Sequence, residues 1–297
     1  MGSAAPLARS TPARPAGRVL VVGSGGMLGR ATMSLLRDLG ADFSGTDIPH
    51  FDFTRPDSIR AGVPAGTSVV INCAAYTDVD GAEKNLDLAR AINATGVGSL
   101  GARCRDIGAV LVHYSTDYVF DGKATSPYLT DQPKNPVNAY GLSKAEGEDA
   151  LAASGCEFLL LRTSWLYAPW AKNFVRTIAK FGGEKPTLRV VNDQRGRPTS
   201  SEHLARTTLA MLAARARGIH HATDAGECTW FDLASAIVSG LRLPAIVEPC
   251  TSAEFPRPAV RPAYSVLDIS KTEALIGPLP EWRETLADVL GRLERPL

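Results

Sequence analysis

The sequence predicts an α/β fold in which a Rossmann-like, doubly wound parallel sheet carries a smaller, interleaved α/β lobe. Three observations lead to this prediction. Short apolar runs alternate with segments of helical periodicity through the first half of the chain. Those runs are apolar along their whole length, which is typical of strands buried on both faces of a parallel sheet. A glycine-rich turn joins the first of them to the first helical segment.

The first half of the chain alternates between strands and helices. Residues 18–40 predict a strand, a tight turn and a helix whose apolar side chains recur until Gly40. Further strands are expected at 41–47, 68–75, 109–117 and 157–164, and helices at 86–108 and 138–154. Helices between parallel strands form right-handed crossovers, so these segments should build one doubly wound sheet.

The second half is more mixed. Helices are expected at 173–181, 201–218 and 231–243, short strands at 188–193 and 218–224, and extended loops where prolines crowd between 244 and 262. We expect residues 17–164 to form the Rossmann domain, with later returns near 187–223, and residues 165–186 and 224–297 to form the smaller lobe. Residues 1–16 are expected to be a disordered leader.

Composition and charge exclude several classes of function. The 297 residues carry 32 Lys and Arg against 31 Asp and Glu, so the chain has no net field that would attract nucleic acid or an anionic membrane. No apolar run approaches the roughly 20 residues that span a bilayer. The 5 cysteines are widely spaced and include no CxxC pair, which is typical of reduced thiols in a cytoplasmic protein. We therefore expect a cytoplasmic protein with no nucleic-acid partner and no membrane attachment.

The turn "GSGGMLG" places Gly23, Gly26 and Gly29 between the first strand and the first helix. The first glycine permits a sharp turn, the second lets backbone amides approach a pyrophosphate, and the third lets the helix pack closely on the sheet. The amino end of the helix then faces the anion. The turn therefore predicts dinucleotide binding, with a purely structural turn as the alternative.

Asp47 ends the second strand, where an acidic side chain can accept hydrogen bonds from the adenosine ribose. A carboxylate there would also repel a 2′-phosphate, which slightly favours NADH over NADPH. Arg30 and Arg55 could soften this repulsion. The alternative for Asp47 is a solvated strand end.

Tyr140 and Lys144 in "NAYGLSK" lie four positions apart on the helix expected at 138–154. Residues i and i+4 share a helix face, so both side chains can point at one site. An ammonium group about 4 Å from the phenol, at an effective dielectric constant near 20, is worth roughly 4 kcal/mol, or about three pKa units. We expect this charge to bring the pKa of Tyr140 toward neutrality, so that the phenol can pass its proton to a developing alkoxide.

Ser115, Thr116 and Asp117 lie where the strand expected at 109–117 ends. Ligands bind at this edge of doubly wound sheets, and a hydroxyl group there can hold a substrate carbonyl. Taken singly, Thr116 is more often a cap or a turn residue. Together with the glycine turn and the Tyr140 and Lys144 pair, it predicts a catalytic site.

These features resemble the extended short-chain dehydrogenase/reductase family, whose members share a GxxGxxG turn, a Ser or Thr after the fourth core strand and a YxxxK helix. The resemblance covers nearly all of residues 18–290. More narrowly, several stretches are similar to the branch that reduces the 4-keto group of dTDP-linked deoxysugars, and "STDYVFDG" is more specific than any glycine motif. These stretches are "GGMLGR", "INCAAYTDVDGAE", "YSTDYVFDG", "NAYGLSKAEGE", "LRTSWLYA", "VNDQRGRPTS" and "RPAYSVLDISK".

The resemblance implies an NAD(P)H-dependent reductase that converts dTDP-4-dehydro-L-rhamnose into dTDP-L-rhamnose, with the substrate held by the smaller lobe. Thr116 would hydrogen-bond the C4 carbonyl, Tyr140 would protonate O4, and Lys144 would lower the pKa of Tyr140 and hold the nicotinamide ribose. NADH or NADPH would contact Gly23, Gly26, Met27, Leu28, Gly29, Asp47, Asp52, Phe53, Ala74, Ala75, Tyr76, Tyr140 and Lys144. The dTDP-sugar would contact Thr116, Asp117, Trp165, Asn173, Gln194, Thr199 and Arg261. The alternative for Trp165 is a core position.

Some members of this branch are described as dimers joined through Mg²⁺, held first by a glutamate two residues after the last glycine of the turn. That position is Ala31 here, so we expect no metal and either a monomer or a homodimer. Two other functions stay open: reduction of another dTDP-ketosugar, as in dTDP-dihydrostreptose formation, and a non-catalytic NAD(P)-binding regulatory subunit. Dehydratase relatives usually carry Thr-Asp-Glu, whereas Tyr118 follows Thr116 and Asp117 in this chain.

Overall fold

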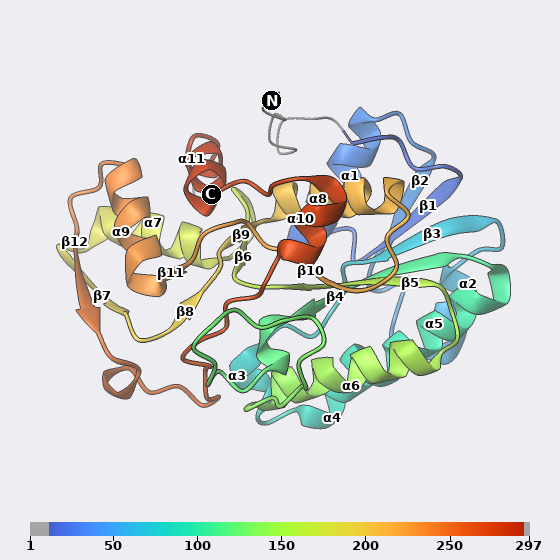
Figure 1. Cartoon of the computed structure of the whole chain (residues 1–297), viewed down its shortest axis with the longest axis horizontal. Helices are drawn as coiled ribbons and strands as arrows, with labels where there is room; N and C mark the ends of the chain where they lie inside the picture. Colours follow the sequence, from blue (N-terminus) through green and yellow to red (C-terminus); the bar gives the residue numbers. More distant parts are fainter. Residues whose placement is uncertain (1–11, 294–297) are drawn as a thin grey trace.

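A 6-stranded parallel sheet forms the centre of the larger lobe, in the order β10, β5, β4, β3, β1, β2 (Figure 1). The computed structural model of the chain describes residues 12–293. The strands of the sheet are β1 (Arg18–Val22), β2 (Phe43–Thr46), β3 (Thr67–Asn72), β4 (Val110–Thr116), β5 (Phe158–Thr163) and β10 (Gly218–His221). The chain runs from β1 outward to β2 and then returns to β3 on the other side of β1. The order of the strands therefore reverses at β1, and the predicted doubly wound fold is confirmed.

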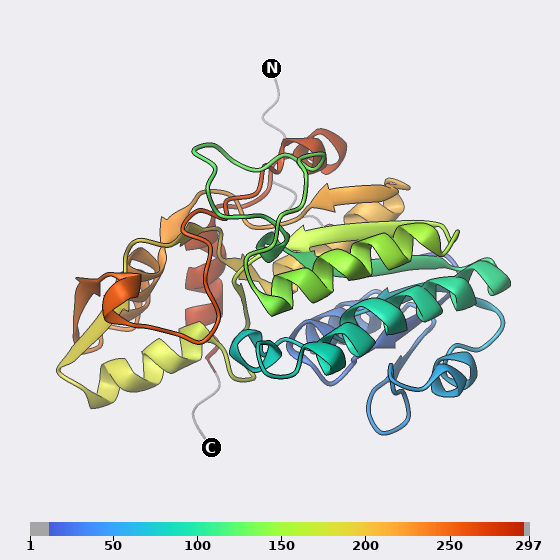
Figure 2. The ribbon, with the colours of Figure 1, turned by 90° about the horizontal axis from the view of Figure 1, so that it is seen from below.

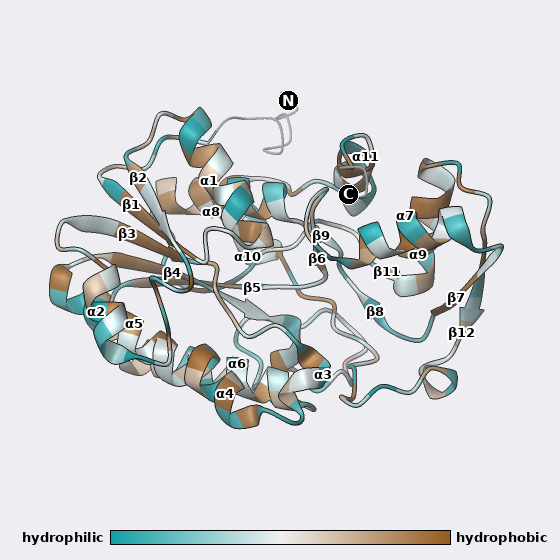
Figure 3. Cartoon of the chain, turned by 180° about the vertical axis from the view of Figure 1, so that it is seen from behind, coloured by the Kyte–Doolittle hydropathy of each residue, from teal (hydrophilic) through white to brown (hydrophobic). Residues whose placement is uncertain are grey.

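Each face of the sheet has its own layer of helices. The helices of the larger lobe are α1 (Met27–Asp38), α2 (Pro56–Gly62), α3 (Val79–Ala82), α4 (Leu86–Arg90), α5 (Gly96–Ile107), α6 (Ala139–Ala153), α8 (Ser201–Ala213) and α10 (Ser270–Ile276). Val19 and Val21 share a hydrophobic core with α1, α8 and α10. Leu20 and Val22 face the other way, toward α2, α5 and α6 (Figure 2). Figure 3 shows the strands as hydrophobic between these layers, which explains their apolar sequences.

The helix expected at 86–108 contains an irregular turn. One turn of π-helix, η2 (Ala91–Thr95), lies between α4 and α5. Within it, the buried carboxamide of Asn93 accepts a hydrogen bond from Tyr76 N at 2.9 Å and donates to Tyr76 O and Ser143 Oγ, both at 3.0 Å. The wide turn therefore ties the loop after β3 to helix α6.

A second hydrophobic core fills the smaller lobe. Its regular elements are α7 (Phe174–Glu184), α9 (Trp230–Gly240), α11 (Trp282–Leu290) and the parallel pair β7 (Thr187–Val191) and β12 (Ile246–Cys250). The short elements are β6 (Leu166–Tyr167), β8 (Arg195–Gly196), β9 (Thr199–Ser200), β11 (Cys228–Thr229) and the 3-10 turns η3 (Asp117–Val119) and η4 (Ser252–Glu254). Leu188 and Val190 point into the core of this lobe.

The boundary between the lobes differs from the expected one in two places. We expected the chain to return to the sheet near residue 187, but β7 pairs with β12 in the smaller lobe and the return begins at α8. Helix α10 packs beside α8 in the larger lobe, although its sequence lies within 224–297. An apolar alternation predicts a strand but does not say which sheet the strand joins.

The amino-terminal leader expected at 1–16 lies in part outside the described residues, which begin at Pro12. The rest of that segment contacts the larger lobe: Pro12 is buried, and Arg14 Nη1 donates to Gly40 O at 3.2 Å. Between residues 12 and 293, no helix has the length and apolar character needed to cross a membrane.

Candidate active site

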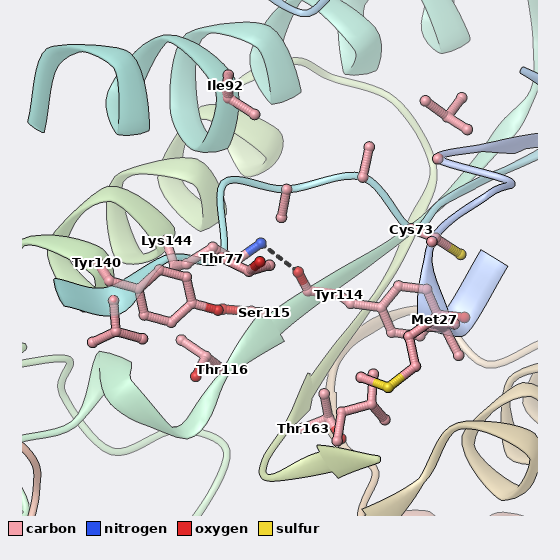
Figure 4. A pocket seen from close by; sticks show the side chains of 18 of the residues that line it. Met27, Cys73, Thr77, Ile92, Tyr114, Ser115, Thr116, Tyr140, Lys144 and Thr163 are labelled. Carbon is pink, nitrogen blue, oxygen red and sulfur yellow. Dashed lines mark hydrogen bonds between the residues drawn. The ribbon is translucent and has the colours of Figure 1, made fainter. Parts of the chain in front are cut away.

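A pocket of about 700 Å³ lies at the carboxyl ends of the central strands, where the smaller lobe meets the sheet (Figure 4). Residues at the ends of β1 to β5 and on helix α6 form most of its wall, and Trp165, Lys172 and Trp230 close it from the smaller lobe. Pockets of this size are typical of cofactor and substrate sites.

Gly23 and Gly26 of the glycine turn line this pocket, as do Met27 and Leu28, whereas Gly29 lies outside the lining. The turn leaves little room for side chains. Gly23 has a φ of +74°, and a Cβ atom there would lie 2.7 Å from Ala74 N. A Cβ atom on Gly29 would lie 2.1 Å from Gly23 O. Gly26 caps α1 without a side-chain hydrogen bond, and the first turn of α1 carries no acidic residue. Without a side-chain cap, the N–H groups of the first turn of α1 can serve an anion, such as the pyrophosphate of a dinucleotide.

We expect Gly29→Ala to unfold the chain more easily and to weaken coenzyme binding. The added methyl group would overlap the backbone of the turn, and overpacking of this kind costs about 1–3 kcal/mol or more. Gly183→Ala in α7 is the matched control, because a Cβ atom there meets nothing within 4 Å. That variant should be as stable as the wild type or more so. Urea denaturation and NADH titration of both variants check this, and equal behaviour of the two would contradict the assigned role of Gly29.

The expected contacts to the adenosine end lie around the same turn. Asp47 lines the pocket, where its Oδ2 accepts from Gly25 N at 2.9 Å and its Oδ1 accepts from Ile48 N at 2.9 Å. Asp52 and Phe53 also line the pocket. The Asp47 carboxylate is thus fixed beside the glycine turn by backbone donors.

The loop after β3 brings Ala74 and Ala75 into the wall, together with Thr77. Tyr76 lies outside the lining, and its backbone is held by Asn93 of η2. The residues on either side of Tyr76, Ala75 and Thr77, therefore form the wall where Tyr76 was expected.

Tyr140 and Thr116 meet in the middle of the pocket, with Ser115 beside them (Figure 4). Asn138 caps helix α6 by accepting a hydrogen bond from Gly141 N at 2.7 Å, which places Tyr140 in the first turn. Thr116 Oγ1 donates to Asp117 Oδ1 at 2.8 Å. Burial raises the pKa of Tyr140 above its usual value, the charge of Asp117 raises it further, and a hydrogen bond with Thr116 opposes both.

This upward shift corrects our expectation that Lys144 would bring the pKa of Tyr140 toward neutrality. The Lys144 ammonium group donates to Tyr114 O at 2.6 Å, seen as the dashed line in Figure 4, and lies 3.3 Å from His113 Nε2. Burial lowers the pKa of Lys144 to about 8, and Glu148 opposes that change. The two residues share a helix face as predicted, but the long lysine side chain reaches toward strand β4.

Three buried polar atoms in the pocket wall have no hydrogen-bond partner among the described residues. They are Ser115 Oγ, Asp117 Oδ2 and Thr163 Oγ1. A buried polar atom without a partner costs about 1–3 kcal/mol, so these atoms are suited to polar groups of a ligand. Burial raises the pKa of Asp117 to about 6.

Trp165 lines the pocket as expected and is also packed like a core residue. Its ring stacks on Trp230 with centroids 3.6 Å apart and planes 10° apart. Its backbone has a φ of +47°, an unusual conformation for a bulky residue. A Cβ atom on Gly196 would lie 2.6 Å from the Trp165 ring, so the chain leaves space for this tryptophan.

The other expected substrate residues lie outside the pocket lining. Asn173 caps α7 and donates to Ala168 O, Gln194 donates to Ser252 Oγ at 2.8 Å, and Thr199 is fully buried. Arg261 donates to Asp80 Oδ1 at 2.5 Å. Each of these polar groups already has a role in the protein or is enclosed by it, so their contacts to a dTDP-sugar stay a prediction.

Sequence reasoning missed Trp230 and Lys172, which both line the pocket. Trp230 is the first residue of α9, and Thr229 with Asp232 forms a capping box before it. The Thr-x-x-Asp spacing marks that helix start in the sequence. Lys172 follows no motif that could single it out.

The structure describes the possible metal-ligating side chains of residues 12–293. That part of the chain contains no group of three or more His, Cys, Asp or Glu that could hold a metal ion. Ala31 stands where the resemblance implies a glutamate in some relatives. It lies on α1 and is buried in the core that this helix shares with α8.

Comparisons with known proteins agree with this architecture. A family model described as the RmlD substrate binding domain matches residues 17–295. The chain is 41% identical over 297 residues to the dTDP-4-dehydrorhamnose reductase of Streptomyces griseus, which covers 95% of this chain and 97% of that protein. It is 40% identical to a protein of Streptomyces antibioticus named a probable dTDP-4,6-dihydroxy-2-methyloxan-3-one 4-ketoreductase, over 91% of this chain and 94% of that protein.

A solved structure is similar over nearly the whole chain. The dTDP-4-dehydrorhamnose reductase of Bacillus anthracis, in complex with NADP, superposes with a TM-score of 0.88 at 34% sequence identity. The match covers 92% of this chain and 98% of that one.

Proposed function

The chain belongs to the family of the RmlD substrate binding domain, and from this membership we propose that it is an NAD(P)H-dependent reductase that converts dTDP-4-dehydro-L-rhamnose into dTDP-L-rhamnose. One observation carries the proposal: the glycine turn, Tyr140 with Lys144, and the unpartnered polar atoms at the ends of β4 and β5 line the same pocket. The names of the relatives from S. griseus and B. anthracis support it.

The residues of this chain account for binding and proton transfer. Bound coenzyme supplies a hydride to C4 of the sugar. Thr116 would turn its hydroxyl group from Asp117 to the C4 oxygen, and Tyr140 would donate its proton to that oxygen as negative charge develops. The raised pKa keeps the Tyr140 phenol protonated at neutral pH, which is the form that a reductase requires. Lys144, whose ammonium group donates to Tyr114 O, would hold the nicotinamide ribose.

The test is the loss of absorbance at 340 nm when the purified protein, with NADH and separately with NADPH, receives dTDP-4-dehydro-L-rhamnose. Oxidation of the coenzyme with formation of dTDP-L-rhamnose is the expected result. A protein that binds coenzyme but oxidises none with this sugar would exclude the rhamnose assignment.

Reduction of another dTDP-ketosugar is the second candidate, because the S. antibioticus relative is named for such a substrate. Other dTDP-ketosugars in the same assay separate the two. A non-catalytic regulatory subunit would not oxidise the coenzyme, whichever sugar is added. The presence of Thr116, Tyr140 and Lys144 in one pocket argues against that function.

We expect NADH to be slightly preferred over NADPH, because the Asp47 carboxylate lines the pocket beside the glycine turn. Asp47→Asn keeps an oxygen for Gly25 N but removes the charge. The ratio of kcat/KM for NADPH to that for NADH should rise by about tenfold, which corresponds to about 1.4 kcal/mol of relieved repulsion. Asp42→Asn, directly before Phe43 at the opposite end of β2, is the control and should leave the ratio unchanged. An unchanged ratio in Asp47→Asn would remove the basis for the NADH preference.

We further infer a cytoplasmic enzyme that works as a monomer or a homodimer. The five cysteines are unpaired thiols, which suits a reducing compartment. Size-exclusion chromatography with light scattering distinguishes the two assemblies.

A further inference from the structure

The loop between β6 and α7, residues 168–173, reaches from the smaller lobe to the amino end of α1. Trp170 Nε1 donates to Met27 O at 3.1 Å, and Asn173 Nδ2 lies 3.7 Å from Met27 Sδ. The Arg30 guanidinium group lies 4.8 Å from the centre of the Trp170 ring. The loop is therefore fastened to the helix end that carries the glycine turn, although it belongs to the other lobe.

The conformation of this loop is set from within. The Asn173 side chain donates to the carbonyl groups of Ala168, Trp170 and Ala171 at 2.9 to 3.2 Å, and its oxygen accepts from Arg176 N. Ala171 is held at a φ of +58°, which is uncommon for a residue with a Cβ atom. These contacts direct the tip of the loop, Ala171 and Lys172, into the pocket wall.

The pocket lining carries more acidic than basic side chains. Its acidic residues are Asp47, Asp52 and Asp117, and its basic residues are Lys144 and Lys172. The Lys144 ammonium group is buried and donates to Tyr114 O. Lys172 is exposed, and no hydrogen bond or ion pair engages it within residues 12–293. The Lys172 ammonium group can therefore form an ion pair with an anionic group of a ligand in the pocket.

We propose that Lys172 binds the diphosphate of the dinucleotide coenzyme, from the side opposite to the glycine turn. A diphosphate at the amino end of α1 receives N–H donors from the first turn of that helix. These donors contribute no full positive charge, and an ammonium group supplies one. The coenzyme would then contact both lobes and hold them together. The proposal rests on the coenzyme of the proposed function and does not depend on which sugar is reduced.

The test measures coenzyme binding without sugar. In Lys172→Gln, the Kd for NADPH, followed by coenzyme fluorescence, should rise by about tenfold, as expected for one lost ion pair to a diphosphate. The Kd should also depend less steeply on salt, because one ionic contact is missing. Lys172→Arg should bind within about threefold of the wild type, since it keeps the charge. Lys180→Gln, on α7 and outside the pocket lining, is the matched control and should change neither quantity.

The substrate also carries a diphosphate, so dTDP is titrated in parallel by calorimetry. We expect the Kd for dTDP to change by less than about twofold in Lys172→Gln. An unchanged Kd for NADPH overturns the proposal, and weakened binding of dTDP in that case would assign the lysine to the substrate diphosphate instead. Because no turnover is measured, a wrong sugar assignment would leave this result unaffected.

Discussion

The Tyr140→Phe variant is expected to reduce the sugar about a hundredfold to ten-thousandfold more slowly than the wild type, the range that one general acid contributes. The substitution removes the proton donor and keeps the ring, which packs edge to face against Tyr118 with centroids 6.0 Å apart. Single-turnover oxidation of NADPH measures the loss directly. Because the phenol contributes chemistry rather than affinity, kcat should fall much more than KM changes.

Coenzyme binding and a second tyrosine serve as controls for this result. The Kd of Tyr140→Phe for NADPH should stay within about threefold of the wild type. Tyr264→Phe removes a phenol that lies outside the pocket lining, and it should turn over normally. If Tyr140→Phe kept its activity, the proton would have to come from another group, and the buried carboxyl of Asp117 would be the first to examine.

The Glu148→Ala variant is expected to lose about 3–5 kcal/mol of its free energy of unfolding, because it leaves a buried guanidinium group without its counter-charge. Glu148 lies on α6, one turn after Lys144, and receives hydrogen bonds from Arg162 Nε at 2.9 Å and Nη2 at 2.7 Å. Both side chains are only 2% exposed. The pair fastens the helix that carries Tyr140 to strand β5. Urea denaturation followed by circular dichroism measures the loss.

Two further variants separate the ion pair from the helix itself. Glu146→Ala, on the same helix, removes the partner of Arg90. The two side chains are 34% (Glu146) and 41% (Arg90) exposed, so the variant should shift the midpoint of urea denaturation little. Glu148→Leu combined with Arg162→Met removes both charges and should recover much of the lost stability. If Glu148→Ala were as stable as the wild type, Thr130 O and His221, which also lie near Arg162, would be sufficient partners for its guanidinium group.

The larger lobe was predictable because its signals repeat. Most central strands are apolar on both faces and helices such as α1 have a clear periodicity, so the order of elements and the position of the glycine turn follow from sequence. The short helices α2, α3 and α10 were missed, since a helix of two turns or fewer carries too little periodicity, and the 9-residue α11 was missed as well. The place of β7 was not predictable, because pairing with β12 depends on contacts far away in sequence.

The candidate site was predicted in position more than in chemistry. Spacing places Tyr140 and Lys144 on one helix face, but it does not predict the position of the ammonium group at the end of the long lysine side chain, which donates to Tyr114 O. Burial, rather than the ammonium charge, dominates the pKa of the Tyr140 phenol. Gln194 and Arg261 are polar residues whose partners, Ser252 and Asp80, lie on other elements, whereas Asn173 caps its own helix. Local sequence patterns do not predict such long-range pairing.

The π turn η2 limits how the gene for this chain can change in length. A π turn holds one residue more than an α turn, so loss of a single codon there, for example that of Ile92, would restore a regular helix and remove the wide turn that sets the direction of Asn93. Asn93 would then turn away from Tyr76 and Ser143. The loop that presents Ala74 and Ala75 to the pocket would lose its anchor without any change in a residue that touches a ligand. Codon deletions at this place should therefore be removed by selection.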